Sequence, residues 1–421
     1  MKMELGWSLA LGVVLAVAGA GALGGCQSAV TTSTAQANTT HSTAAVATTA
    51  SSAASPITTT GAPTSMTTTA ESVSTTTAEA AGNGLWAVDA GEDKSGFIDK
   101  SGKMVIAATY DGADDFSEGL AAVEVADKDG FIDPSGTVVI SPQYESVSDF
   151  HDGLAAVSIG DKWGFIDTTG KLVIPAQYDQ TGDFSEGLAP VIQSTKYGPK
   201  YGYIDKTGTL VIPAQYDEAY SFSGGLARVN ILTGLGFIDK SGNLVVQPQY
   251  LDAGDFSEGL AAVQDHNNHW GFIDTKGTVV VPLQYDDAGR FSEGLAPVDV
   301  MRGHGYMFID ATGRTVIPAQ FFTAESFSEG LASVRLFDGN SAFIDKQGKV
   351  KMTLKMMQGD LPLSDFKNGF AMLDLGMAQE LIDAGGKVIW STPGGRKVTP
   401  VTAPPGPTAL GPRSVLGALA S

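Results

Sequence analysis

A motif that recurs nine times is the feature that most limits how this chain can fold. Phe-Ile-Asp or a close variant ends at nine aspartates spaced 34 to 38 residues apart: Asp99, Asp133, Asp167, Asp205, Asp239, Asp274, Asp310, Asp345 and Asp383. Relatives of Phe-Ser-Glu-Gly-Leu lie between them, starting at Phe116, Phe150, Phe184, Phe222, Phe256, Phe291, Phe327 and Phe366. Self-similarity with a period of about 20 to 50 residues is the signature of a repeat architecture. Residues 84–391 are therefore expected to form one tandem array of nine units.

Each unit is expected to contain three short antiparallel strands. In the third unit these are Leu154–Ile159, Trp163–Asp167 and Lys171–Ile174. The second and third strands are joined by Asp-x-x-Gly in all nine units. Aspartate accepts hydrogen bonds from nearby backbone N–H groups, and glycine adopts the left-handed conformation that closes such a hairpin. The recurrent aspartate is thus interpreted as a turn residue rather than a catalytic one, and the unit as a β-meander.

The fold class expected is all-β, an array of nine three-stranded antiparallel meanders. One meander cannot bury enough surface to be stable alone. Its third strand is apolar on both faces, through Leu172, Val173 and Ile174, so neighbours are expected to cover both faces. The aromatic residues Tyr178 and Phe184 are expected to fill gaps between units. Because no unit is split between the two ends of the array, an open stacked superhelix is favoured, with a closed β-propeller-like ring as the alternative.

Length variation is concentrated in the hairpin between the first and second strands. The distance from turn Asp to loop Phe is 17 residues in the first seven intervals, whereas the distance from loop Phe to the next Asp varies from 17 to 21. These hairpin tips carry the candidate binding residues Tyr197, Tyr201, His266, His269, Trp270, His304 and Tyr306. Stacking in register would align them along one edge as a binding surface. Alternatively, insertions accumulate there because they do no harm.

No pattern of residues indicates catalysis, a metal site or a cofactor. His266 and His269 form His-x-x-His, but only Asp265 stands nearby, which is too few ligands for zinc. The acids of the loop motif recur in many units, whereas an active site needs one asymmetric group of residues. The array carries a net charge of −21 and the whole chain −20, because the flanking segments are slightly positive together. Such a negative charge disfavours a nucleic-acid partner. The chain is therefore predicted not to be an enzyme and to bind no cofactor or nucleic acid.

The N-terminal segment is typical of an exported protein. Leu9–Leu23 is an apolar run suited to a signal peptide, predicted over residues 1–25. It ends at Leu23-Gly24-Gly25-Cys26, which resembles the lipobox of bacterial lipoproteins and implies lipidation of Cys26, the only cysteine. An ordinary signal peptide followed by a chance cysteine is the alternative. Residues 26–83, rich in Thr, Ala and Ser, and the Pro/Gly-rich residues 392–421 are predicted to be a disordered tether and tail.

The repeat resembles the WG-repeat family of bacterial proteins. Trp163-Gly164-Phe165-Ile166-Asp167 and Trp270-Gly271-Phe272-Ile273-Asp274 match its Trp-Gly-Phe-Ile-Asp motif in full. Elsewhere the tryptophan is replaced, as at Asp129, Tyr201 and Leu235. The resemblance implies a repeat fold and a surface or exported location, and it implies no catalytic activity.

These inferences together predict a non-catalytic repeat lipoprotein that acts as a binding or scaffolding module. It would be exported and anchored through Cys26 to the bacterial cell membrane, facing the extracytoplasmic side. One alternative is a carbohydrate or cell-wall binder whose tip aromatics stack on sugars. The other is an accessory subunit that presents a partner enzyme. The expected partners are the membrane and a protein or cell-wall glycan.

Overall fold

The computed structural model describes residues 84–91, 93–232, 234–300, 305–355, 364–375, 378–395 and 400–401. The signal peptide, the lipidated Cys26 and the tether predicted above lie outside these residues. No helix long and apolar enough to span a lipid bilayer is found in the described part of the chain. The described secondary structure consists of β-strands in nine small antiparallel sheets, each of which is called a blade below.

The strands of the first five blades are, in order: β1 (Leu85–Asp89), β2 (Ser95–Asp99) and β3 (Met104–Tyr110); β4 (Gly112–Ala113), β5 (Ala121–Glu124), β6 (Asp129–Ile132) and β7 (Val138–Tyr144); β8 (Leu154–Ile159), β9 (Lys162–Asp167) and β10 (Leu172–Tyr178); β11 (Leu188–Thr195), β12 (Gly198–Asp205) and β13 (Leu210–Tyr216); β14 (Glu218–Ala219), β15 (Leu226–Ile231), β16 (Gly234–Asp239) and β17 (Leu244–Tyr250).

The remaining four blades are formed by β18 (Asp252–Ala253), β19 (Leu260–Gln264), β20 (Trp270–Asp274) and β21 (Val279–Tyr285); β22 (Asp287–Ala288), β23 (Leu295–Asp299), β24 (Tyr306–Asp310) and β25 (Thr315–Phe321); β26 (Thr323–Ala324), β27 (Leu331–Arg335), β28 (Ser341–Asp345), β29 (Val350–Leu354) and β33 (Pro400–Val401); and β30 (Phe370–Asp374), β31 (Gln379–Asp383) and β32 (Val388–Ser391).

The predicted three-stranded meander is confirmed in every blade, and the structure adds a short element beside it. In five blades a two-residue strand pairs with the end of the first long strand, as β4 does through Gly112↔Glu124 and Ala113↔Val123. In the third and fourth blades an isolated bridge takes its place, for example Val147↔Val157. Two residues are too few to show a strand period, so the sequence pattern did not reveal this element.

The Asp-x-x-Gly turn has the geometry expected from its residue types. Asp167 Oδ1 accepts hydrogen bonds from the backbone N–H groups of Thr169 at 3.0 Å and Lys171 at 3.1 Å. The glycine has φ of +81° at Gly170, where its hydrogen atom faces the neighbouring blade. A Cβ built there would lie 3.1 Å from Ile140 Cγ1 of the preceding blade. Glycine is therefore required twice, by the left-handed backbone and by the close approach of the preceding sheet.

Aromatic side chains fill the joints between blades, as the sequence predicted. Phe184 precedes the fourth blade and packs edge-on against Phe165 of the third, with ring centroids 4.8 Å apart. Phe184 and Tyr178 are both buried in a core shared by the two blades. The third strand is less covered than expected: Ile174 is buried, but Leu172 and Val173 remain exposed at the outer edge of the ring. The hydrophobic core therefore lies between blades, on the axial side of the outer strands.

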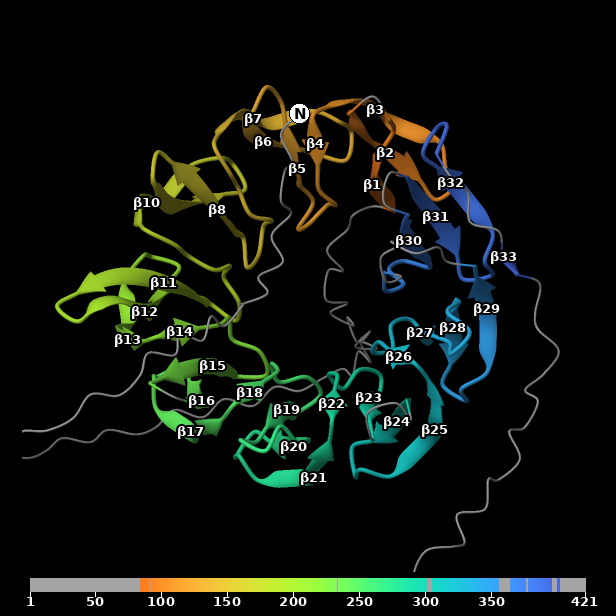
Figure 1. Cartoon of the computed structure of the whole chain (residues 1–421). Helices are drawn as coiled ribbons and strands as arrows, with labels where there is room; N and C mark the ends of the chain where they lie inside the picture. The colour runs from red at the N-terminus through yellow and green to blue at the C-terminus, as the bar shows by residue number, and fades with distance from the viewer. Residues whose placement is uncertain are drawn as a thin grey trace, which may run out of the picture. The chain divides into compact units, whose positions relative to one another are not determined.

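The nine blades form a closed, propeller-like ring, the alternative to the favoured open superhelix (Figure 1). Closure joins the first blade to the ninth. Trp86, Val88 and Ile98 share a buried cluster with Leu381 of β31. Gln379 Oε1 accepts a hydrogen bond from Asp89 N at 3.1 Å, and Thr392 Oγ1 donates to Asp89 O at 3.1 Å. Whole blades thus close the ring through side chains and loops, without the shared blade whose absence favoured an open array.

The C-terminal residues bear on two further predictions. Pro400 and Val401 of the predicted tail form β33, which pairs with Thr353 and Leu354 of β29. This part of the tail is therefore ordered strand rather than disordered chain. The predicted insertion in the fourth unit lengthens its first hairpin, because β11 and β12 pair over eight residues each, from Leu188↔Asp205 to Thr195↔Gly198.

Candidate functional site

Three of the seven candidate tip residues are packing residues. Tyr201, Trp270 and Tyr306 occupy equivalent positions in their blades and pair across strands with Tyr216, Tyr285 and Phe321, respectively. All three are half-buried and lie against the cores between blades. Burial and a hydrogen bond to Asp287 raise the pKa of Tyr306. These aromatic rings consequently offer a partner only part of their surface.

The other tip residues are exposed but stand on separate blades. Tyr197 is 78% exposed at the end of the long fourth hairpin, and the Lys196 ammonium lies 4.7 Å from its ring centroid. His266 and His269 are exposed on the sixth blade, where Asp265 Oδ1 accepts from His269 N at 2.9 Å. The fifth blade separates these two tips. His304 lies outside the described residues, so the structure gathers no single tip cluster from the predicted set.

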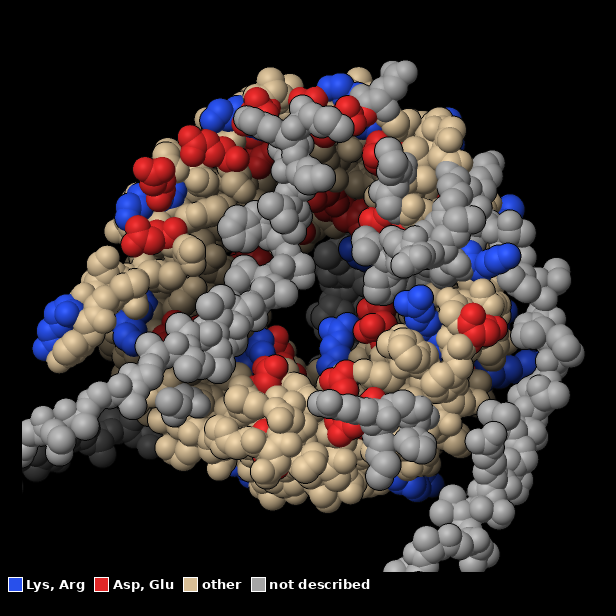
Figure 2. All heavy atoms as spheres, in the orientation of Figure 1, with Lys and Arg blue, Asp and Glu red and all other residues tan. Residues whose placement is uncertain are grey.

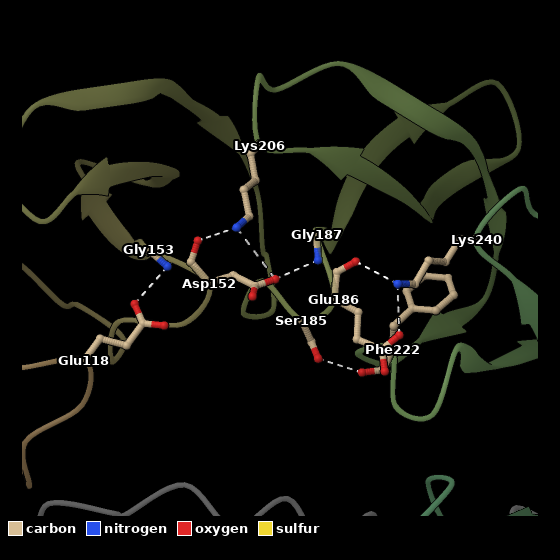
Figure 3. A network of polar contacts seen from close by, with 9 residues as sticks. All are labelled: Glu118, Asp152, Gly153, Ser185, Glu186, Gly187, Lys206, Phe222 and Lys240. Atoms are coloured by element: carbon tan, nitrogen blue, oxygen red, sulfur yellow. Dashed lines mark hydrogen bonds and ion pairs between the residues drawn. The ribbon is translucent and has the colours of Figure 1, made fainter. Parts of the chain in front are cut away.

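The recurring Phe-Ser-Glu-Gly motif joins each blade to the next. We call this segment, which precedes the first long strand of a blade, the entry loop. Ser185 Oγ donates to the carbonyl oxygen of Phe222 in the next entry loop at 2.6 Å. The acidic residue accepts from the glycine N–H of the next entry loop, as Glu118 does from Gly153 at 2.8 Å (Figure 3). The acids that recur in the sequence are therefore structural links between blades.

Lysines strengthen three of these links. Lys240 of the fifth blade lies beside Glu186 of the fourth, with Nζ 3.0 Å from Oε2, and also donates to the Glu186 carbonyl oxygen at 3.0 Å (Figure 3). Lys206 contacts Asp152 and Lys346 contacts Glu293 in the same way. Burial raises the pKa of Glu293, but hydrogen bonds from Lys346 and Gly330 outweigh it and lower that pKa. In the entry loop of the fifth blade, Gly224 replaces the acid, so that joint lacks the carboxylate.

Residues on either side of the entry-loop phenylalanines converge near the axis of the ring. Arg290 Nη2 lies 3.8 Å from Asp365 Oδ2, and Lys367 Nζ lies 3.9 Å from Asp115 Oδ2. Each of these pairs joins two blades that are separated by a third blade, which is possible only close to the axis. Charged side chains gather around the central opening (Figure 2).

The axial end is acidic on one side. Burial, with the nearby charge of Asp115, raises the pKa of Asp114, and burial, with the charge of Asp114, raises that of Asp149. Across the axis stand two arginines instead, Arg228 and Arg290. The sequence patterns singled out none of these residues. The available signal was Arg290, the single base among eight residues preceding the loop phenylalanines: Asp115, Asp149, Asp183, Ser221, Asp255, Arg290, Ser326 and Asp365.

A cavity of about 490 Å³ opens on the arginine side of the axis. Its wall includes Arg228, Asp255, Arg290, Glu325 and Asp365, which come from the fifth to the ninth blades. Charged residues of five blades therefore line one space near the axis.

Comparison with known proteins identifies the repeat. The family model described as "WG containing repeat" matches residues 96–128, 130–163, 163–197, 201–231, 236–268, 270–300 and 306–340, which is more than half of the chain. No curated protein matches the sequence.

Solved structures show only a loose likeness. The computationally designed Ika8 protein has 13% identity and a TM-score of 0.41, over 65% of this chain and 93% of that one. A eukaryotic initiation factor has 12% identity and a TM-score of 0.45, over 64% and 83%. BamB from Moraxella catarrhalis has 12% identity and a TM-score of 0.37, over 63% and 85%. Likenesses at this level say nothing about function.

Proposed function

The chain belongs to the WG containing repeat family, and we propose that its ring is a non-catalytic binding and scaffolding module. One observation carries the proposal. The recurring polar side chains of the described residues are engaged in turns and blade joints, as Asp167 and Glu118 are. The chemistry available to a partner is therefore the chemistry that differs between blades, at the hairpin tips and at the axis. A rigid ring with variable tips is an arrangement suited to holding partners.

We place the partner surface at the exposed hairpin tips. Tyr197, His266 and His269 project from the fourth and sixth blades and are free of the packing that holds Tyr201 and Trp270. The array carries a net charge of −21. Such a field favours association with a partner of net positive charge and opposes an anionic one. A protein with a basic surface is the partner that fits both features.

Binding of a carbohydrate or cell-wall glycan is the second candidate, and Tyr197 favours it. A tyrosine that is 78% exposed offers a face for a sugar ring. The candidate is weaker because Tyr201, Trp270 and Tyr306 are half-buried in their blades. A role as an accessory subunit that presents an enzyme rests on the same tips and would be distinguished by the identity of the captured protein.

The proposal includes a lipid anchor at Cys26 and an extracytoplasmic location. Its support is the apolar run Leu9–Leu23, followed by Leu23-Gly24-Gly25-Cys26, in a chain with one cysteine. Mass spectrometry of the mature protein should find an acylated Cys26 as the first residue. Cys26→Ser should move the protein from the membrane fraction to the soluble fraction. Membrane association that survives this change would contradict the anchor.

Capture of partners from a cell-surface extract tests the binding function. The bait is the full-length protein in detergent, compared with a variant in which Tyr197, His266 and His269 are alanine. The control carries alanine at Lys100, Thr168 and Thr275, which are exposed in Asp-x-x-Gly turns at the opposite ends of the strands. The control is expected to retain, and the tip variant to lose, a specific basic protein. Equal capture by wild type and tip variant would eliminate the tips as the partner surface.

A further inference from the structure

The axial cavity has the size of a small-molecule site and an asymmetric wall. Its volume of about 490 Å³ falls within the range of about 300 to 1,000 Å³ typical of ligand pockets. Two arginines that depart from the repeat meet here beside an open space at Gly254.

The first departure is Arg228, at the third position of β15. The equivalent residues in the other blades are uncharged: Ala87, Ala122, Ala156, Pro190, Ala262, Pro297, Ser333 and Met372. The Arg228 guanidinium lies 3.8 Å from the centroid of the Tyr220 ring and donates to the carbonyl oxygen of Ala253. Its Nε lies 3.4 Å from Asp255 Oδ1, without hydrogen-bond geometry. Arg228 is thus a cation fixed in place at the wall of the cavity.

The second departure is Arg290, which precedes a loop phenylalanine where other blades have aspartate or serine. Its side chain is 64% exposed and its partner, Asp365, lies at 3.8 Å. A pair at that distance, with both partners exposed, is weak. Arg290 can therefore turn toward a bound anionic group at little loss.

The third feature is the open space beside Gly254. The equivalent position is also glycine at Gly182 and Gly289, where a Cβ would come within 3 Å of a proline ring. In the fifth blade the position holds Tyr220, and in the second Asp114. A Cβ at Gly254 would meet only Ala262, 3.9 Å from its Cβ and 4.0 Å from its carbonyl oxygen, and the φ of Gly254 is not in the left-handed region. Neither backbone nor packing requires glycine at this position. The effect of glycine at this position is to leave the space beside it open.

The same cavity wall carries Glu325, an exposed carboxylate. Burial, together with the charges of Asp365 and Asp287, raises its pKa. The carboxylates around Glu325 therefore repel its charged form, and a cationic group placed among them would relieve that repulsion. The cavity wall thus presents two guanidinium groups together with the carboxylates of Asp255, Glu325 and Asp365.

We propose that this cavity binds a small zwitterion of the amino-acid or short-peptide class. The ligand carboxylate lies against Arg228 and Arg290, and its ammonium group lies against Glu325 and Asp365. A wall with two arginines and three carboxylates matches a molecule with both charges better than a simple anion or cation. An uncharged sugar fits less well, because the Tyr220 ring on which it could stack is covered by Arg228. This site is independent of the hairpin tips.

Calorimetric titration of the full-length protein with a set of dipeptides tests the proposal. The best binder is compared with its N-acetylated, its C-amidated and its doubly blocked forms. At least one zwitterionic dipeptide should bind, and blocking either end should weaken binding at least tenfold. Absence of binding by every zwitterion in the set, or equal binding of the blocked forms, would overturn the proposal.

Two variants and two controls place the ligand. Gly254→Tyr, which copies the residue of the fifth blade, and Arg290→Ser, which copies Ser326 of the eighth, should each weaken binding at least tenfold. Asp149→Ser changes the equivalent position of the third blade and should leave binding unchanged, as should the alanine variant of Tyr197, His266 and His269. If Gly254→Tyr lowers the melting temperature, the placement of the ligand is judged from the Arg290→Ser variant alone. Wild-type binding by a folded Arg290→Ser variant would overturn the placement. This outcome does not depend on the result of the capture experiment with the tip variant.

Discussion

Trp86 of the first blade packs edge-on against Phe370 of the ninth, with ring centroids 4.7 Å apart and planes at 65°. The other joints also hold an aromatic pair, but they form it between the second strand of one blade and the entry loop of the next, as Phe131 and Phe150 do at 4.8 Å. Trp86 instead stands at the second position of a first strand, where the other blades have alanine. The ring is therefore closed by an aromatic contact at positions that differ from those of the other joints.

Trp86→Ala should destabilise the ring about as much as loss of a large aromatic side chain from any joint. Trp86 is 6% exposed, and truncation of a buried Trp or Phe lowers the free energy of unfolding by about 3–5 kcal/mol. Urea titration of the Trp86→Ala, Phe370→Ala and double variants should give a coupling of about 0.5–1.5 kcal/mol. Leu232→Ala, at a residue 84% exposed, is the control and should change stability by less than about 0.5 kcal/mol. Strictly additive effects of the two aromatic substitutions would contradict the contact.

Two glycines separate backbone strain from contact between blades. Gly208 has φ of +81° and would place a Cβ 3.1 Å from Ile174 Cγ2, whereas Gly153 has φ of +83° with nothing within 4 Å. Gly153→Ala should lower the free energy of unfolding by about 1–2 kcal/mol, through the left-handed backbone alone. Gly208→Ala should lower it by a further 1–3 kcal/mol or so, because the methyl group crowds the neighbouring blade. Equal losses in the two variants would show that the Asp-x-x-Gly turns do not contact the next blade.

Asp129 should make the ring less stable at neutral pH than at pH 4. Burial, with Glu124 and Asp114 nearby, raises the pKa of Asp129 from 3.8 to about 6. A carboxyl group with a raised pKa in the folded state binds its proton more tightly when folded, so stability falls as pH rises from about 4 to 6. Asp129→Asn should remove that slope and stabilise the protein at pH 7 by up to about 1 kcal/mol, since Asp129 is half exposed and its repulsion is screened.

Below pH 4 the turn aspartates should make the stability of the fold decrease as the pH is lowered. Hydrogen bonds from Thr312 and Arg314 lower the pKa of Asp310 to about 2, despite an opposing effect of desolvation. A lowered pKa contributes stability that is present above the unfolded value near 3.8 and is lost as pH falls toward 2. Urea unfolding from pH 2 to 7 should therefore show maximal stability near pH 4. A monotonic rise in stability up to pH 7 in the wild type would contradict this account.

Local features were predictable from sequence because they depend on residues close together in the chain. The nine aspartates of the Asp-x-x-Gly turns make the expected hydrogen bonds because Asp and Gly act within five residues of each other, as in Asp167 to Lys171. Phe184 and Tyr178 were recognisable as joint residues because their spacing is fixed by the repeat. The family resemblance was correct for the same reason.

Ring closure and the axial end were not predictable in this way. Whether nine blades close depends on a small rotation between neighbours summed around the ring, and no short motif encodes that sum. The link from Glu118 to Gly153 spans 35 residues, and only the structure shows that these two meet. Trp270 and Tyr306 were interpreted as tip residues because of their neighbours in the sequence, but as the first residues of β20 and β24 they pair with the third strands. Arg228 and Arg290 lie 62 residues apart and share a cavity only because the ring brings their blades to one axis.

Closure of the ring is the claim on which the positions of the axis and its cavity depend, and one distance tests it. Spin labels on Lys100→Cys and Ala384→Cys occupy equivalent, exposed turns of the first and ninth blades; Cys26 is replaced by serine. Labels on Thr275→Cys and Ala311→Cys, in the neighbouring sixth and seventh blades, give the reference. Double electron–electron resonance should find the same separation for both pairs. A separation between the first and ninth blades much longer than the reference would mean an open superhelix.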